Sequence, residues 1–363
     1  MSLDSETDSM VDLDPSESMR TRCDEVGRTT LAIREFSRSE RASAVEPGNV
    51  MQPSLGQSLD ITIASEFAPE NRATVYAGDC MDLLRSMPDA CVQLVVTSPP
   101  YNIGKEYEDV LDIDTYKAQQ REVIRECVRV LKPEGSICWE VGNYVRGGEI
   151  IPLDILLYDC FREEGLKLRN RIIWHFGHGL HCKNRFSGRY ESIIWFTKSD
   201  DYVFNLDPIR VPQKYPGKKH FKGPNKGEYS GNPKGKNPSD VWEIPNVKAN
   251  HVEKTDHPCQ FPVALIQRLV LSMTNEGDLV LDPFLGVGTT AVAAVMNGRR
   301  AVGAELVERY YELAVDRIRK ALAGELKVRA DKPVYRPSSG LSLATNPWAD
   351  AQQPGLRLRE DED

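Results

Sequence analysis

The chain has 363 residues, of which 40% are hydrophobic and 28% are charged. This is the balance of a soluble globular protein, long enough for one large domain or two. No run approaches the roughly 18 uncharged apolar residues of a membrane span, and the acidic start does not resemble a secretory signal. Eight cysteines without a CxxC pair indicate reduced cytoplasmic thiols. Secreted, membrane and disulfide-stapled classes are therefore excluded.

The net charge of −8 is concentrated near the two ends of the chain. Residues 1–69 carry 13 acidic and six basic side chains, and residues 328–363 carry six acidic and five basic ones. Residues 70–327 are therefore neutral, and within them residues 214–236 hold seven lysines and one acidic residue. Such a local cluster of positive charge favours a polyanionic partner, although the total charge does not.

Taken in chain order, residues 1–69 predict a disordered acidic leader with a helix near 24–37, and residues 328–363 predict a disordered tail. Between them, strand and helix signals alternate. The predicted strands cover residues 73–77, 92–97, 136–141, 168–174, 191–197, 279–282 and 301–305. The predicted helices cover residues 81–85, 114–131, 151–164, 263–273, 289–297 and 308–323.

This alternation predicts an α/β fold with a doubly wound, mostly parallel sheet. A stretch rich in lysine, glycine and proline, residues 206–256, interrupts the alternation. We expect it to be an inserted recognition region that separates two halves of one domain, residues 70–205 and 257–327.

A glycine-containing loop, DPFLGVGTT at residues 282–290, follows a predicted strand and opens a predicted helix. Gly286 and Gly288 allow a tight turn beside a ligand, and the helix start offers free N–H groups. Glu305 ends the next strand, 17 residues after Gly288, where an acidic side chain can bind the hydroxyls of a ribose. The loop lacks the Gly-Lys-Ser/Thr of a phosphate loop, which favours a nucleoside ligand.

A second turn, Ser98-Pro99-Pro100-Tyr101, leaves the carboxyl end of an apolar strand, where open α/β sheets bind their ligands. Two consecutive prolines make this turn rigid. A hydroxyl, a fixed carbonyl and an aromatic ring together predict a pocket for a planar group that carries an amine. Ser98 and the Pro99 carbonyl would accept the hydrogens of the amine, and Tyr101 would stack on the ring.

Together, SPPY at residues 98–101 and DPFLGVGTT at residues 282–290 resemble the DNA amino-methyltransferases that use S-adenosylmethionine. The catalytic motif precedes the cofactor motif, as in the β-ordered group of that family, which implies a Rossmann-like methyltransferase fold with permuted motif order. The resemblance covers residues 72–322. The element HPCQFP at residues 257–262 departs from the family's HPTQKP at Cys259 and Phe261, so it is left out of the predicted site.

The resemblance implies roles for the residues that match the motifs. Two residues, Asp79 and Cys80, would line the adenine side of the cofactor pocket, although an isolated Asp79 would more often be a turn residue or a helix cap. Glu305 would bind the ribose. Phe284, Gly286 and Gly288 would shape the cofactor loop beside the methionyl part of the cofactor. The loop would contribute Asp282, Phe284, Gly286, Gly288 and Thr289. The catalytic turn would comprise Ser98, Pro99, Pro100 and Tyr101.

The implied chemistry is direct transfer of a methyl group to an exocyclic amine, which depends on alignment and electrostatics rather than on a covalent enzyme nucleophile. The target base would have to be flipped out of the duplex. Methylation at carbon 5 of cytosine requires a cysteine in the catalytic turn, and neither Cys80 nor Cys91 lies there.

The lysine-rich stretch predicts an arm that follows DNA phosphates, with Lys218, Lys219, Lys222 and Lys226 as contacts; a solvated insert is the alternative. Arg185, Arg189 and Lys248 are further candidates for contacts to DNA. A metal site at His175, His178, His181 and Cys182 is not expected, because glycines at 177 and 179 interrupt any ligand-bearing helix.

The sequence thus predicts a site-specific methyltransferase of double-stranded DNA, acting on cytosine N4 and located in the cytoplasm at the nucleoid. It would be the modification enzyme of a restriction–modification system, with an endonuclease that acts on the same site without direct contact. Adenine N6 is the alternative target. Protein-glutamine methyltransferases place the cofactor loop before their Pro-Pro-Tyr turn, the reverse of the order here. A non-enzymatic DNA-binding module would not need both the cofactor loop and Glu305.

Overall fold

The computed structural model describes residues 62–105, 110–177, 179, 181–248 and 251–329. The predicted helix near 24–37 and the predicted disorder of residues 1–61 and 330–363 lie outside the described residues. Two contacts lie just outside the predicted range 70–327. Ala64 forms a parallel bridge with Thr74, and the Arg329 backbone N–H donates to Oε1 of Glu253 at 3.0 Å.

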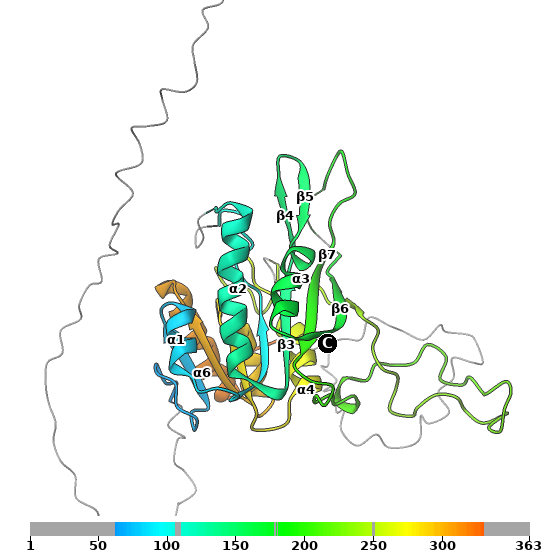
Figure 1. Ribbon diagram of the computed structural model, residues 1–363. Helices are drawn as coiled ribbons and strands as arrows, with labels where there is room; N and C mark the ends of the chain where they lie inside the picture. Colours follow the sequence, from blue (N-terminus) through cyan, green and yellow to red (C-terminus); the bar gives the residue numbers. More distant parts are fainter. Residues whose placement is uncertain (1–61, 106–109, 178, 180, 249–250, 330–363) are drawn as a thin grey trace, which may run out of the picture. The chain divides into compact units, whose positions relative to one another are not determined.

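An eight-stranded sheet runs through the described domain (Figure 1). Its strands, in spatial order, are β1 (Ala73–Ala77), β10 (Arg300–Glu305), β9 (Leu279–Asp282), β2 (Val92–Thr97), β3 (Leu131–Val141), β7 (Tyr190–Thr197), β6 (Lys167–His175) and β8 (Val241–Glu243). The first five strands are parallel, β7 runs antiparallel to both its neighbours, and β8 is parallel to β6. The predicted doubly wound, mostly parallel sheet is confirmed.

Helices cover both faces of this sheet. One face carries α1 (Cys80–Ser86), α2 (Ile113–Val130) and α3 (Leu153–Glu163), and the other carries α4 (Val263–Met273), α5 (Thr289–Met296) and α6 (Glu308–Leu322). Successive side chains of β2 alternate between the two apolar clusters, because Leu94 packs with α4–α6 and Val95 with α1–α3. Burial on both faces explains the uninterrupted apolar run of β2. Among the described helices, none is long and apolar enough to cross a membrane.

A hairpin that the sequence analysis did not predict follows β3. It pairs β4 (Asn143–Arg146) with β5 (Glu149–Pro152), and Gly147 and Gly148 form its turn with φ of 58° and 85°, a conformation that favours glycine. Because Ile151 pairs with Tyr144 in this hairpin, the helix predicted from residue 151 begins at Leu153.

Two further boundaries differ from the prediction. Strand β3 begins at Leu131 rather than at Ser136, and its pairing with β2 shifts register between Val92 and Leu94. The residues between the predicted helix 114–131 and the predicted strand 136–141 therefore belong to an irregular part of a strand. Of the predicted insert 206–256, the described part contains the short helix η1 (Asp207–Ile209) and β8, which extends the main sheet beside β6.

The strand order places the two sequence motifs together. From β9 the chain proceeds outward through β10, and from β2 it proceeds in the opposite direction to β3. β2 and β9 pair directly, Leu94 with Val280 and Val95 with Leu281. Their carboxyl ends therefore meet at the point where the winding reverses, which is where open α/β sheets bind ligands.

Candidate active site

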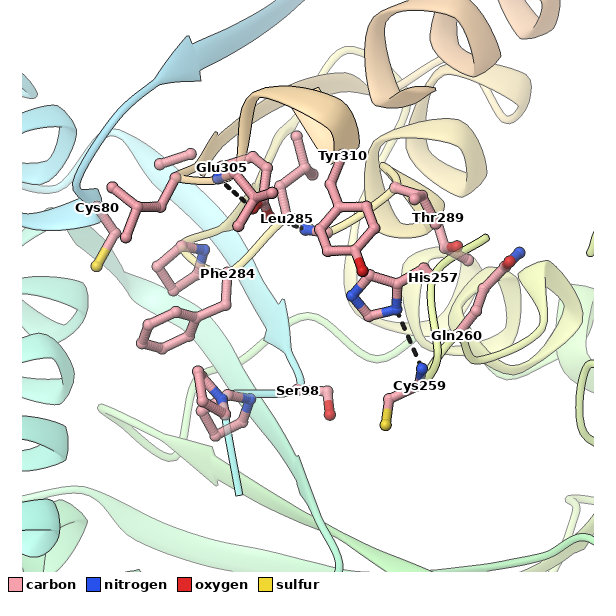
Figure 2. A pocket seen from close by; sticks show the side chains of 18 of the residues that line it. Cys80, Ser98, His257, Cys259, Gln260, Phe284, Leu285, Thr289, Glu305 and Tyr310 are labelled. Atoms are coloured by element: carbon pink, nitrogen blue, oxygen red, sulfur yellow. Dashed lines mark hydrogen bonds between the residues drawn. The ribbon is translucent and has the colours of Figure 1, made fainter. Parts of the chain in front are cut away.

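A cavity of about 190 Å³ opens at this edge of the sheet, between the turn after β2 and the loop after β9. Ten of the residues predicted for the catalytic and cofactor sites line it. These are Asp79, Cys80, Ser98, Pro99, Pro100, Tyr101, Phe284, Gly286, Thr289 and Glu305. Segments that are almost 200 residues apart in the sequence thus form one wall (Figure 2).

Two predicted residues, Asp282 and Gly288, lie behind the cavity rather than in its lining. Asp282 is buried, and its Oδ1 accepts hydrogen bonds from Thr97 Oγ1 at 2.5 Å and from the Phe284 backbone N–H at 3.1 Å. Burial raises its pKa to about 6. Because Thr97 precedes the Ser-Pro-Pro-Tyr turn, this carboxyl joins the two motifs of the site.

Gly288 is the N-cap residue that precedes α5, and it has a φ of 77°. A Cβ atom at this position would lie 3.1 Å from Cβ of Ala314 in α6. The residue therefore allows the loop to pack closely against α6, which positions the segment from Phe284 to Val287 at the cavity.

Glu305, at the end of β10, holds the cofactor loop from the other side. Its Oε2 accepts a hydrogen bond from the Gly286 backbone N–H at 2.8 Å, and its Oε1 accepts one from the Val307 backbone N–H at 2.8 Å. Burial raises its pKa to about 7. A carboxylate oxygen can accept more than one hydrogen bond, so Glu305 retains acceptor capacity toward the cavity.

Hydrogen bonds to helix α2 and to strand β3 hold the Ser-Pro-Pro-Tyr turn in place. The Pro100 carbonyl accepts from Tyr116 Oη of α2 at 2.9 Å. Tyr101 Oη donates to Oε2 of Glu140, a buried residue of β3, at 2.7 Å, and lies 3.0 Å from Ser98 Oγ. A tyrosine hydroxyl has one proton, and here Glu140 accepts it. The Ser98 hydroxyl must therefore donate to Tyr101, which leaves the lone pairs of Ser98 as acceptors.

A second carboxyl, Glu191 of β7, supports this assignment. Burial and the neighbouring Glu140 raise the pKa of Glu191 well above its usual range, which favours the neutral form of Glu191. Burial, Glu140 and Glu191 also raise the pKa of Tyr101 well above its ordinary value. Tyr101 therefore stays protonated and continues to donate to Glu140.

At the opposite end of the cavity, Asp79 caps α1, and its Oδ1 accepts from the Met81 backbone N–H at 2.7 Å. The helix-cap interpretation of Asp79 is thus confirmed, and the residue also lines the cavity. Burial and Asp79 raise the pKa of the adjacent Cys80 to about 12. The Cys80 thiol is therefore neutral at physiological pH and a poor nucleophile.

The structure adds residues that the prediction left out. His257, Cys259, Gln260 and Phe261 line the cavity, as does Tyr310 of α6. The His257 and Tyr310 rings meet edge to face at 4.6 Å, and His257 Nδ1 accepts from the Cys259 backbone N–H at 3.2 Å (Figure 2). The HPCQFP element carried the signal for four of them, whereas Tyr310 looked like an ordinary apolar position of a helix.

The four predicted DNA contacts, Lys218, Lys219, Lys222 and Lys226, are exposed and lie outside the cavity lining. Backbone hydrogen bonds fold their segment back on itself, from Ser230 to Lys218 at 2.8 Å and from Gly227 to His220 at 3.0 Å. Lys219 Nζ lies 5.0 Å from the centroid of the Tyr229 ring.

His178, one member of the considered metal cluster, lies outside the described residues. His175 ends β6, and His181 and Cys182 lie in the loop that follows it. Among the residues that the structure describes, no group of three His, Cys, Asp or Glu side chains is placed to hold a metal ion.

A model of the DNA methylase family that includes N6- and N4-specific enzymes matches residues 92–316. The chain belongs to this family. The identification made from the motifs, an S-adenosylmethionine-dependent DNA amino-methyltransferase, is confirmed.

Individual relatives of this chain are also named DNA methyltransferases. The type II methyltransferase M.BglII of Bacillus subtilis is 52% identical over 71% of this chain and 72% of its own length. M.ScaI of Streptomyces caespitosus is 39% identical over 72% of this chain and 89% of its own. The DNA adenine methyltransferase YhdJ of Escherichia coli K12 is 32% identical over 68% of this chain and 82% of its own.

Among solved structures, TTHA0409 of Thermus thermophilus, a DNA modification methylase complexed with S-adenosyl-L-methionine, is 30% identical with a TM-score of 0.50. The match covers 69% of this chain and 96% of that one. The cytosine-N4-specific PvuII DNA methyltransferase is 21% identical with a TM-score of 0.53, over 69% of this chain and 93% of that one, a likeness that supports the fold.

Proposed function

We propose that this DNA methyltransferase transfers a methyl group from S-adenosylmethionine to the exocyclic N4 amine of cytosine in double-stranded DNA. The observation that carries the proposal is Ser98 at the head of the catalytic turn. Its hydroxyl proton is engaged by Tyr101, and its lone pairs can accept a hydrogen of an amine in the cavity. In this family, the turn mostly begins with serine in relatives that methylate cytosine N4 and mostly begins with aspartate in those that methylate adenine N6.

The cavity suits S-adenosylmethionine because it has an apolar end and a polar end. Phe284 and the neutral thiol of Cys80 provide an apolar end for adenine, beside the ribose acceptor Glu305. This differs from the sequence-based expectation that Phe284 lies beside the methionyl part. His257, Gln260 and Thr289 provide a polar end for the methionyl group (Figure 2). The bound cofactor supplies a methyl group activated by its sulfonium.

The protein's own residues prepare the amine. An exocyclic amine is a poor nucleophile because its lone pair is delocalised into the ring. An acceptor at Ser98 draws one hydrogen out of the ring plane and favours the tetrahedral nitrogen that attacks the methyl group. Glu140 strengthens this acceptor through Tyr101, since each hydrogen bond in such a chain polarises the next. No covalent enzyme intermediate is required, and the high pKa of Cys80 argues against one.

Adenine N6 is a second candidate, because the relative YhdJ is named an adenine methyltransferase. The structure also removes one argument for cytosine. A free Ser98 proton would suit N3 of cytosine, but here that proton is directed to Tyr101. The choice between the bases therefore depends on the family's use of serine at the head of the turn.

Mass spectrometry of the nucleosides from DNA methylated in vitro tests the choice. We expect N4-methylcytosine. N6-methyladenine as the sole product would replace the target base, and 5-methylcytosine would contradict the mechanism as well. Sequencing of DNA from cells that express the protein would give the modified site. A restriction endonuclease that cuts the unmodified form of this site is the expected counterpart in the cell.

A further inference from the structure

The loop that joins β6 to β7 rises from the same edge of the sheet as the cavity. β7 runs antiparallel to β3, and Ser192 of β7 pairs with Val141 at the carboxyl end of β3. A Cβ atom on Gly142 would lie 3.0 Å from Cε2 of Tyr101 and 3.4 Å from Oε1 of Glu191. The chain thus enters β7 directly beside the catalytic turn.

Residues 181–189 of this loop, the β6–β7 tip, have the composition of a nucleic-acid contact. They contain the basic residues Lys183, Arg185 and Arg189 and no acidic residue. Phe186, between these charges, has an exposed fraction of 101%, the highest among the large apolar side chains that the structure describes. At no more than about 3.5 Å per residue, Phe186 lies within about 17 Å of Glu191.

Hydrogen bonds brace the tip below Phe186. The Cys182 backbone N–H donates to Ser187 Oγ at 3.0 Å across the turn. The Phe176 backbone N–H donates to the Arg189 carbonyl at 3.0 Å, which continues the pairing of the two strands beyond His175 and Tyr190. A two-stranded ribbon of this kind fits the major groove of B-DNA.

We propose that Phe186 is an apolar wedge that enters the DNA stack where the target base has been flipped out. The inference rests on the proposed function, because only an enzyme that extrudes its target base leaves such a gap. Proteins that distort the duplex insert phenylalanine and similar side chains between base steps. Here Lys183 and Arg185 would contact the phosphates on either side, and the short path to Glu191 keeps the wedge close to the pocket that receives the base.

The test compares methyl transfer to two duplexes in a single turnover. Both duplexes carry the unmethylated recognition site of the enzyme. One of them has a mismatch opposite the target base, which lowers the free energy needed to flip that base. With Phe186→Ala, we expect the rate on the paired duplex to fall about tenfold to a hundredfold, the range of an aromatic–base stacking contact. The rate on the mismatched duplex should fall less than about threefold, because the base is already loosened. Phe186→Leu, which keeps an apolar wedge, should recover most of the loss on the paired duplex.

Phe221→Ala is the matched control, since Phe221 is also highly exposed, at 90%, but lies in the lysine-rich stretch. It should leave the ratio of the two rates unchanged. If Phe186→Ala slows both duplexes equally, or slows neither, the wedge is refuted while the proposed function stands. If the unaltered protein transfers no methyl group to either duplex, the proposed function itself fails.

Discussion

The cavity between β2 and β9 and the lysine-rich stretch of residues 214–236 were both predicted from short motifs, but they are built in opposite ways. In the cavity, the Ser-Pro-Pro-Tyr turn and the cofactor loop each follow a buried parallel strand, β2 and β9, and Asp282 and Glu305 tie these loops together. In the lysine-rich stretch, the described side chains are mostly exposed, and short backbone turns replace strands. Transfer of a methyl group requires fixed geometry, whereas phosphate contacts tolerate a surface that adapts to the duplex.

This contrast predicts that changes in the cavity alter the rate of transfer, with little effect on DNA binding. Ser98→Ala should give the largest effect, because it removes the acceptor proposed for the target amine. We expect the single-turnover rate to fall about a hundredfold or more, as for the loss of one transition-state hydrogen-bonding group. DNA affinity in gel-shift assays should change less than about threefold, since Ser98 lines the cavity and is not in the exposed lysine-rich stretch.

Ser86→Ala is the matched control for this change. Ser86 Oγ bonds only the Leu83 carbonyl of its own helix among the interactions described, at 2.7 Å. It should leave the rate unaltered. An equal loss in both variants would mean that the effect of Ser98→Ala is structural.

Tyr101→Phe separates the two roles of this side chain, stacking and polarisation. Phenylalanine keeps the aromatic ring but breaks the chain from Ser98 to Glu140. We expect a rate about tenfold lower, the effect of a lost hydrogen bond to a charged group. Affinity for DNA with a mismatched target should not change. A rate within a factor of two of the unaltered protein would show that the hydroxyl chain does not contribute to catalysis.

Binding of S-adenosylmethionine should depend on pH through Glu305. Burial raises the pKa of this carboxyl to about 7, so its neutral form predominates below that pH. The neutral acid is the weaker acceptor for ribose hydroxyls. The dissociation constant measured by calorimetry without DNA should therefore rise about tenfold as the pH falls from 8 to 6. Glu305→Gln should bind more weakly and lose this dependence. A flat profile for the unaltered protein would exclude Glu305 as the ionised ribose ligand.

The strands that end at the cavity could be predicted because they are buried on both faces, which gives uninterrupted runs such as residues 92–97. Glu140 could not, because a single acidic residue in the apolar strand β3 resembles a boundary rather than a buried partner of Tyr101. The β4–β5 hairpin had a signal, Gly147-Gly148, that the helical pattern from residue 151 obscured. β8 has only three residues, too few for a pattern.

Substitutions in the lysine-rich stretch should have the opposite effect to those in the cavity, because they should weaken DNA binding. Replacing Lys218, Lys219 and Lys222 by glutamine should weaken DNA binding about a hundredfold near physiological salt, if all three contact phosphates. It should also reduce the slope of log affinity against log salt by about 2.7, if all three contact phosphates. Cofactor affinity should be unaffected. Glutamine at Lys167, Lys320 and Lys327, exposed lysines outside the stretch, is the control for total charge. An unaltered salt slope in the first variant would refute the phosphate-contact role.

Removal of the acidic leader should have the smallest effect on the rate of methyl transfer. Chains truncated at two different residues would show where the catalytic unit begins. Ala64 exchanges backbone hydrogen bonds with Ala73 and Val75, at 3.0 and 2.9 Å, so it extends the pairing at β1. A chain that begins at Thr62 keeps this pairing, and its methyl-transfer rate should stay within about twofold of the full chain. A chain that begins at Phe67 loses the two backbone hydrogen bonds of Ala64. Its free energy of unfolding should fall by about 1–3 kcal/mol, and it should unfold at a lower temperature. Thermal unfolding and single-turnover rates of both chains measure the difference. Loss of activity in the Thr62 chain with an unaltered unfolding temperature would show that the leader takes part in the reaction. The catalytic unit would then extend beyond the cavity to residues before Thr62.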